Sequence, residues 1–459
     1  MAGRRSSEAG DPVVEPEPAA PGTARRGLLG ALALLPEGTM AVGVGLAVTG
    51  IASYCYLVVA ARTLELAEFG RLSVLWSLVF LAGGTFLPFE QEVSRRLVGR
   101  RVAGVGGRPV VVGAIKVGSA LVAVLALLAL VASPVLADRL FSGDRFMVAC
   151  LGLGMAGYWV ANLSEGVLSG NGRFARYGAY LGVEASLRLF VCVACAVIGV
   201  TTAGPIGLAL GIAPVVTAIV LLWGRRELVE PGPPLPLREF AGGLGALLTG
   251  ALLAQALINA SPVLVQLLAG PDGAAQTAVF TTALLVARVP LFLFQAVQAA
   301  LLPKLSGMAA RNEFAAFTTL VKRLVVIVAA LIAVGASVAF ALGPVVIELV
   351  FKYQVERRTV TLLAIGSGGY ITATAMALGI IALGGAKRVV VGWAAGVVTL
   401  IVVVMFGTDP LLRVETAFAS STIVATVIMA LVLRAQLRSG AKLEQGPLLD
   451  ALNDISFEP

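Results

Sequence analysis

Histidine is absent from the sequence of 459 residues. Its absence excludes catalysis by a histidine base or nucleophile, zinc sites with histidine ligands, and membrane acyltransferases that depend on a histidine base. Charge is also scarce, because Asp, Glu, Lys and Arg make up 13% of the residues and apolar residues make up 58%. Soluble domains carry about 25% charged residues. With a mean hydropathy of +0.94, this composition predicts an integral membrane protein.

Cysteine is rare, and its four positions all lie within apolar stretches: Cys55, Cys150, Cys192 and Cys195. A secreted disulfide framework is therefore not expected. The C-x-x-C pair at 192–195 has no second pair to complete a metal site, so we expect no metal and no cofactor. The net charge of +8 does not imply nucleic-acid binding, because in a membrane protein the position of the basic residues matters more than their sum.

Long apolar segments dominate the chain. A helix that crosses about 30 Å of hydrocarbon needs roughly 17 to 25 apolar residues. Twelve segments meet this requirement, at residues 38–61, 72–89, 110–132, 147–169, 178–200, 203–224, 241–269, 277–303, 324–343, 359–383, 389–407 and 414–434. Most of the 34 Lys and Arg residues fall on one side of these spans if both termini are cytoplasmic, which is the orientation that the positive-inside rule favours.

The segment at residues 225–240 divides the chain into two halves, because it carries four prolines and three arginines. We therefore expect an all-α helix bundle with six-helix lobes at 38–224 and 241–434, joined by a cytoplasmic linker. Residues 1–37 are read as a disordered cytoplasmic tail, and residues 435–459 as a second cytoplasmic tail. Residues 166–172 (GVLSGNG) align with residues 379–385 (GIIALGG), as two related halves would.

Ionisable groups inside spans are functional candidates, because they are costly in hydrocarbon. Arg288 lies near the middle of the eighth span, and Arg188 lies near the middle of the fifth, with Glu184 one turn before it. Two arginines facing one cavity suit a phosphate or pyrophosphate. The alternative for Arg188 is a structural pair with Glu184. Asn259 and Gln295 are candidate contacts for a sugar-bearing substrate.

A second group of charged residues lies at the end of the second span: Glu90, Glu92, Arg95 and Arg96. One interpretation is a solvated, charge-paired helix end. The other is a cytoplasmic gate or a surface that attracts anionic headgroups. Lys116 and Glu165 lie closer to the ends of their spans, and snorkelling towards the interface explains both.

Several segments resemble a known family. Residues 61–70 (ARTLELAEFG), 166–174 (GVLSGNGRF) and 299–306 (AALLPKLS) resemble the ends of the first, fourth and eighth helices of polysaccharide exporters. These exporters belong to the multidrug/oligosaccharidyl-lipid/polysaccharide flippase superfamily. The resemblance implies a MATE-like bundle that alternates between inward-open and outward-open states and moves a polyprenyl-pyrophosphate-linked oligosaccharide across the plasma membrane.

The resemblance also implies the partners: a lipid-linked anionic saccharide, membrane lipids and polysaccharide biosynthesis enzymes. No enzymatic activity and no nucleic acid are expected. A drug or metabolite antiporter is the first alternative, with Glu184 in place of the carboxylate that such relatives carry in the first helix. A polyprenyl-phosphate-dependent glycosyltransferase that uses Glu65 or Glu68 is the second alternative.

Overall fold

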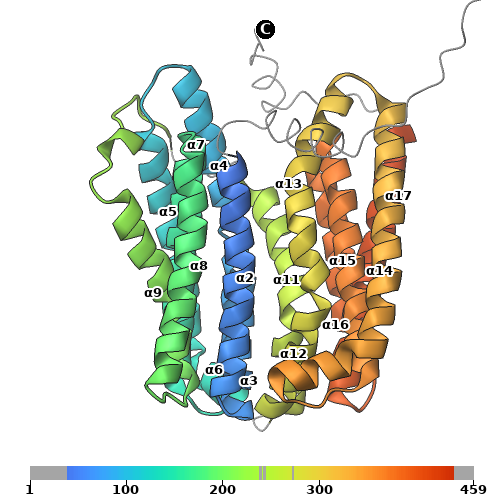
Figure 1. Cartoon of the computed structure of the whole chain (residues 1–459). Helices are drawn as coiled ribbons and strands as arrows, with labels where there is room; N and C mark the ends of the chain where they lie inside the picture. Colours follow the sequence, from blue (N-terminus) through green and yellow to red (C-terminus); the bar gives the residue numbers. More distant parts are fainter. Residues whose placement is uncertain (1–38, 237–239, 241–243, 271–272, 439–459) are drawn as a thin grey trace, which may run out of the picture.

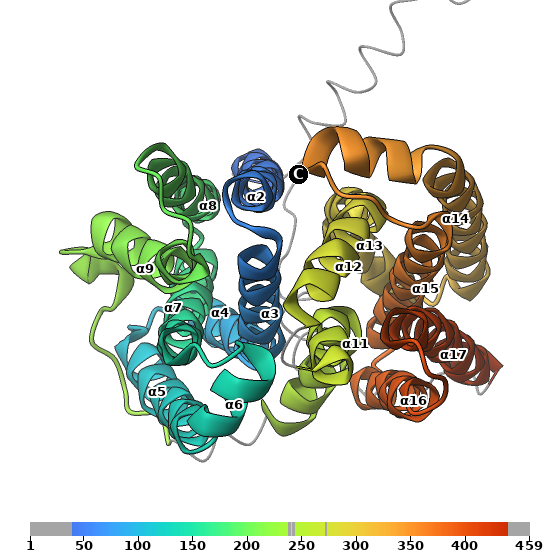
Figure 2. The ribbon, with the colours of Figure 1, turned by 90° about the horizontal axis from the view of Figure 1, so that it is seen from below.

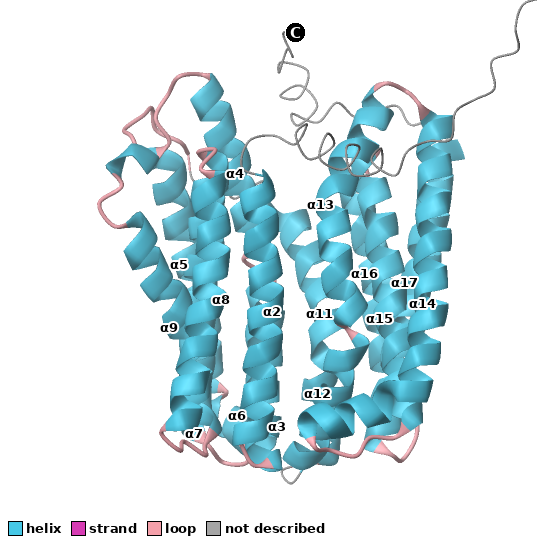
Figure 3. Cartoon of the chain, in the orientation of Figure 1, coloured by secondary structure: helices cyan, strands magenta, loops and turns pink. Residues whose placement is uncertain are grey.

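The predicted spans form helices because the hydrocarbon core offers backbone groups no partner, so each apolar segment must satisfy its own hydrogen bonds. The computed structural model of the chain describes residues 39–236, 240, 244–270 and 273–438. Within these ranges the regular structure is entirely helical, as Figure 3 shows. The described residues contain 11 helical segments long and apolar enough to cross a membrane, which confirms a multi-pass membrane protein.

The first half of the chain builds one lobe. Its helices are α2 (Thr39–Thr63), α3 (Leu66–Gly83), α4 (Leu87–Val102), α5 (Arg108–Val131), α6 (Ser133–Leu140), α7 (Arg145–Gly170), α8 (Phe174–Val197) and α9 (Ala203–Leu222). A short 3-10 turn, Arg226–Leu228, follows in the linker. In Figures 1 and 2 these helices gather on one side of the molecule. We call this group the N-lobe.

The second half builds the C-lobe on the other side of the molecule (Figure 2). Its helices are α11 (Leu244–Ala269), α12 (Ala274–Ala287), α13 (Val289–Ala310), α14 (Phe314–Phe351), α15 (Arg357–Ala382), α16 (Ala386–Val404) and α17 (Pro410–Arg438). Each of the twelve predicted spans therefore has a helical counterpart. The tails predicted at 1–37 and 435–459 lie largely outside the described residues, so their disorder and cytoplasmic position stay predictions.

The second span of each lobe is interrupted. In the N-lobe, α3 ends at Gly83 and α4 begins at Leu87, with Pro88 in its first turn. In the C-lobe, Arg288 separates α12 from α13, and Pro290 lies in the first turn of α13. Interrupted helices at corresponding positions of two halves are typical of transporter binding sites near the membrane midplane.

One predicted boundary is wrong. The sequence places the end of the ninth span at residue 343 and an outward loop after it, but α14 is a single helix of 38 residues that continues to Phe351. Pro344 lies inside this helix and removes one backbone hydrogen bond without ending it. Beyond Pro344 the helix runs across the end of the bundle towards α2 (Figure 2). Buried Ile347 and Phe351 hold this last part against the protein.

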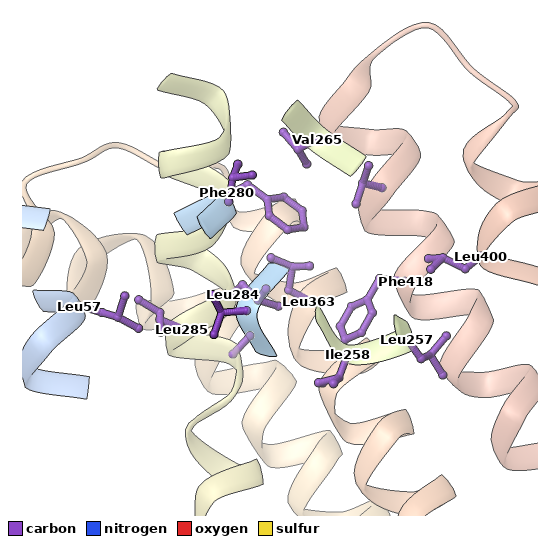
Figure 4. Packing of buried hydrophobic residues seen from close by; sticks show 14 of the residues in the cluster. Leu57, Leu257, Ile258, Val265, Phe280, Leu284, Leu285, Leu363, Leu400 and Phe418 are labelled. Carbon is purple, nitrogen blue, oxygen red and sulfur yellow. The ribbon is translucent and has the colours of Figure 1, made fainter. Parts of the chain in front are cut away.

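The lobes approach closely where α2 ends and α3 begins, which is the outward end in the predicted orientation. A Cβ atom on Gly70 of α3 would overlap the backbone carbonyl of Ala274 of α12. Apolar side chains continue this contact further into the bundle, where Leu57 of α2 and Leu285 of α12 belong to one buried cluster (Figure 4). The cluster extends through the C-lobe to Phe418 of α17.

Candidate functional site

Arg288 lies at the break between α12 and α13, and its guanidinium donates a hydrogen bond to the backbone carbonyl of Ile258 in α11. The Nε atom of Arg288 is buried and has no hydrogen-bond partner. Tyr370 of α15 lies within electrostatic range. Among the described residues, no carboxylate forms an ion pair with Arg288. Within the part of the chain that the structure describes, the break therefore presents a cation without a carboxylate partner.

A polar strip on α11 connects this break with the one in the N-lobe. The side chain of Asn259, next to Ile258, donates to the Oε1 atom of Gln255 at 2.7 Å. Gln255 in turn packs against Gly84, the residue that follows α3. Arg288 is bonded to Ile258, and Asn259 is the next residue in the chain, so these two predicted site residues lie close together. Gln295 lies in α13, but its side chain falls outside the part of the chain that the structure describes.

Arg188 has a carboxylate partner. Its guanidinium donates to Glu184 at 2.7 Å, one turn earlier on α8, and only 5% of Arg188 is exposed. The guanidinium also lies 5.3 Å from the centre of the Trp76 ring of α3, a geometry that favours a cation–π interaction. The pairing expected from the i, i+4 spacing is therefore present, and Arg188 is not a free cation.

Two more carboxylates lie near this pair in the N-lobe. Glu90 of α4 accepts a hydrogen bond from the hydroxyl of Tyr177 at 3.0 Å. Glu165 of α7 lies within electrostatic range of both Glu90 and Glu184. The sequence interpretation of Glu165 as a snorkelling residue does not account for this neighbourhood. In the N-lobe, Glu165 thus has two carboxylates nearby, one of which is paired with Arg188, whereas none of the described carboxylates pairs with Arg288 at the break in the C-lobe.

An aromatic row borders the N-lobe carboxylates. Trp76 stacks on Phe80 at 4.7 Å between ring centres, Phe80 meets Tyr158 edge-on at 5.3 Å, and Tyr56 lies 5.5 Å from Trp76. Trp76, Phe80 and Tyr158 are only partly buried. Aromatic rings offer flat apolar faces with polar edges, so this row complements the charged groups. These aromatic residues were not predicted as site residues, because their helical spacing is also typical of packing.

Glu92 holds two of the predicted cytoplasmic arginines. It is 3% exposed and accepts hydrogen bonds from Arg95 at 2.9 and 2.8 Å and from Arg96 at 2.5 Å. The guanidinium of Arg96 also lies 5.7 Å from the centre of the Phe240 ring in the linker. This cluster resembles the charge-paired helix end of the first interpretation. The gate or headgroup role stays a prediction.

Arg188 and Arg288 lie in different lobes and have different neighbours. No described pocket is lined by both, so a shared cavity stays a prediction. A groove of about 900 Å³ lies between α2 and α8, but the described residues that line it, such as Val44, Leu187 and Phe190, are apolar or small. This groove therefore does not contain the candidate site.

Two carboxylates at the end of the bundle that is outward in the predicted orientation have structural partners. Glu415 of α17 is 0% exposed and accepts hydrogen bonds from Thr359 at 2.6 Å and Arg358 at 3.2 Å. Glu68, a residue of the glycosyltransferase alternative, accepts from the backbone N–H of Ala203 at 2.8 Å. The Glu415 cluster was not predicted, because Thr359 and Arg358 lie on α15 and meet Glu415 only when α15 packs against α17.

Comparison with known proteins identifies relatives of unknown function and solved structures with a similar fold. No protein-family model matches the chain. An uncharacterized protein of Mycobacterium tuberculosis is 27% identical over 417 residues, which cover 85% of this chain and 89% of the relative. A second uncharacterized protein of M. tuberculosis is 28% identical over 263 residues, covering 54% of this chain and 58% of that protein.

Solved structures match over more of the chain. The inward-facing conformation of a multidrug resistance MATE family transporter of the MOP superfamily has a TM-score of 0.64 and 14% identity, and covers 88% of this chain and 99% of that chain. A MOP superfamily transporter from Pyrococcus furiosus, reported for the reverse polarity of its binding pocket, has a TM-score of 0.63 and 14% identity over 88% of this chain and 95% of that chain. The chain is therefore a multi-pass membrane protein with the fold of the MATE family transporters of the MOP superfamily.

Proposed function

We propose that the chain is a flippase of the plasma membrane that moves a polyprenyl-pyrophosphate-linked oligosaccharide, or a related polysaccharide precursor, by alternating access. The fold supports transport by two lobes that move against each other. The observation that carries the choice of substrate is Arg288, which lies at a helix break within the membrane without a carboxylate partner. A guanidinium in this position is suited to a phosphate oxygen.

The surroundings of Arg288 favour a substrate that is both anionic and polar. Gln255 and Asn259 supply amide groups between the two helix breaks, and amides hydrogen-bond readily to sugar hydroxyls. The aromatic row of the N-lobe adds flat surfaces for the sugar rings. Moving two negative charges outward through an inside-negative potential releases roughly 5 kcal/mol per 100 mV. Such a substrate therefore brings its own driving force.

The partners follow from this proposal. The substrate is a lipid-linked anionic saccharide, the surrounding lipids contact the outer faces of both lobes, and polysaccharide biosynthesis enzymes supply the substrate. The chain itself performs no chemical reaction on it. Glu65 and Glu68 thus have no catalytic role in this proposal, and the bond from the N–H of Ala203 gives Glu68 a structural one.

The test is mass spectrometry of lipid-linked glycans in cells that lack the protein. We expect one polyprenyl-linked glycan to accumulate, wild-type protein to relieve the accumulation, and Arg288→Ala to fail. Arg311→Ala is the matched control, because Arg311 is an exposed arginine paired with Glu313 outside the candidate site. An unchanged glycan profile, with redundant transporters removed, would contradict the proposed substrate.

A drug or metabolite antiporter is the second candidate, and the N-lobe carboxylates favour it. Glu165 lies within electrostatic range of both Glu90 and Glu184, and Glu184 is paired with Arg188. Ionised carboxylates repel each other in a low dielectric, and a bound proton or cation relieves that repulsion. In this case Glu165→Gln abolishes resistance to an exported compound and leaves lipid-linked glycans unchanged. Exposed Glu227, replaced by Gln, provides the control.

A further inference from the structure

The two lobes exchange hydrogen bonds at the outward end of the bundle. Arg62, in the last turn of α2, donates from Nε to the carbonyl of Val350 at 2.6 Å and from Nη2 to the carbonyl of Leu349 at 3.2 Å. In return, the hydroxyl of Tyr353, just past α14, donates to the carbonyl of Ala61 in α2 at 2.8 Å. Each lobe thus supplies a donor to the end of a helix in the other lobe.

These acceptors are carbonyls that the helices themselves leave without partners. The last four C=O groups of an α-helix have no intrahelical N–H donor. They also form the negative end of the helix dipole, which favours a nearby cation such as Arg62. The bonds therefore replace water at both helix ends only while the lobes are in contact. When the lobes separate at this end, water can satisfy the same carbonyls again.

The segment that reaches across to α2 is the last part of α14, residues 344–351, which we call the arm. Its Ile347 and Phe351 are buried against the protein, while Val345 is 59% and Leu349 is 76% exposed. Pro344, at the start of the arm, lacks the N–H that would bond to the preceding turn, so the helix is weakened there. The arm lies across the side of the molecule where α2 faces the C-lobe (Figure 2).

The donor beyond the arm is suited to a lasting bond. Tyr353 is half-buried, and desolvation raises the pKa of its hydroxyl above the ordinary value. The hydroxyl thus stays protonated and remains a donor at physiological pH. In all three bonds the donor is a side chain and the acceptor is a backbone carbonyl. The contribution of each donor can therefore be removed without changing the arm itself.

We propose that the arm is the outward latch of the transporter. Arg62 and Tyr353 hold the arm to α2 while the outward end is closed. When that end opens, the arm bends away from α2 at Pro344. The inference rests on the alternating access of the proposed function. It does not depend on which substrate is carried. The arm is then the segment whose release gives the space between the lobes access to the outward side.

The test measures the outward distance between the lobes directly. Spin labels at Thr201→Cys and Thr408→Cys report it, because both residues are exposed in outward connections, one in each lobe. The full chain is used in lipid nanodiscs, with the four native cysteines replaced by Ala. Double electron–electron resonance then gives the populations of the short and the long distance between the two labels. No substrate is needed, so failure of the latch and failure of the flippase assignment are separate results.

We expect Tyr353→Phe, which removes only the hydroxyl, to raise the ratio of open to closed outward states about fivefold. Arg62→Ala should raise it about tenfold or more, because its bonds involve a charged donor. Arg139→Ala, an exposed arginine of α6 at the same end, should leave the ratio unchanged. The proposal is overturned if Tyr353→Phe and Arg62→Ala behave like Arg139→Ala. Tyr353→Phe keeps the ring, so the test stands even if Arg62→Ala fails to fold.

Discussion

Arg188 donates to the carboxylate of Glu184 at 2.7 Å across one turn of α8, with side chains that are 6% and 13% exposed. Removing one member of such a pair leaves a buried charge without a partner, which costs about 3 to 5 kcal/mol. We expect Glu184→Leu to lower the unfolding free energy in detergent by this amount. Denaturant titration followed by near-ultraviolet circular dichroism measures the change.

The double variant Glu184→Leu/Arg188→Met is the control for that experiment. It removes both charges, so it should be less destabilised than either single variant. Equal losses in the single variants and the sum of both in the double variant would mean that the two side chains act independently, contrary to the pairing in the structure.

The buried Glu415 should matter more to stability than the exposed Asp409, although both face Arg358. Glu415 is 0% exposed and also accepts a bond from Thr359, whereas the side chain of Asp409 is 47% exposed and lies 3.5 Å from Arg358. We expect Glu415→Ala to cost about 2 to 3 kcal/mol and Asp409→Asn at most about 1 kcal/mol. Thermal unfolding of the two purified variants side by side gives the comparison, and similar melting temperatures would contradict it.

Two glycines of α2 provide a matched pair for packing. A Cβ atom on Gly45 would overlap the backbone of Gly178 in α8, whereas a Cβ atom on Gly43 would meet open space. We expect Gly45→Ala to destabilise the protein by about 1 to 3 kcal/mol, because α2 and α8 must separate. Gly43→Ala should be neutral or stabilising by up to about 1 kcal/mol, because alanine favours a helix.

The measurement for this pair is the midpoint of thermal unfolding in one detergent. If Gly43→Ala lost as much stability as Gly45→Ala, the loss could not be attributed to the close approach of α2 and α8. The hydrogen bond from Thr49 to the carbonyl of Leu181 at 2.9 Å joins the same two helices. Thr49→Val should therefore weaken the same interface.

Water should reach the position of Arg288 in at least one conformation. A cysteine there, in a chain without its native cysteines, is expected to react with a membrane-impermeant thiol reagent added from one side of oriented vesicles. A cysteine at Leu331, which faces outward from α14 with 58% exposure, lies on the lipid side and should stay unreactive. If the cysteine at 288 is protected in every condition, Arg288 is a packing residue and the substrate site lies elsewhere.

The helices were predictable because hydropathy and span length fix them nearly independently of their neighbours. The Glu184–Arg188 pair was predictable for the same reason, since both residues lie on one face of one helix. The end of α14 was not, because a proline within a helical pattern usually marks a helix boundary, whereas here the helix continues past Pro344 with Ile347 and Phe351 buried against the protein. Local sequence patterns therefore predicted local structure, whereas the arm depends on contacts with α2, which is distant in the sequence.

The hydrogen-bond partners of Arg288 in the candidate site and of Arg62 at the arm could not be predicted, because they are backbone atoms. Arg288 bonds to the carbonyl of Ile258 and Arg62 to the carbonyl of Val350. Every residue carries such an acceptor, so no residue type in the sequence points to it. Glu165 was visible as a charge in a span, but its position beside Glu90 and Glu184 depends on how α4, α7 and α8 pack.

The break at Arg288 also has a consequence for how the chain enters the membrane during synthesis. With 14 residues, α12 is about 21 Å long and cannot cross about 30 Å of hydrocarbon alone. It must enter together with α13, and the break between the two helices holds Arg288, which costs about 2.5 to 3.5 kcal/mol at mid-membrane. The carbonyl that receives this arginine belongs to α11, the preceding helix. The ribosome thus delivers the acceptor before the donor, and α11 through α13 are expected to insert as one unit.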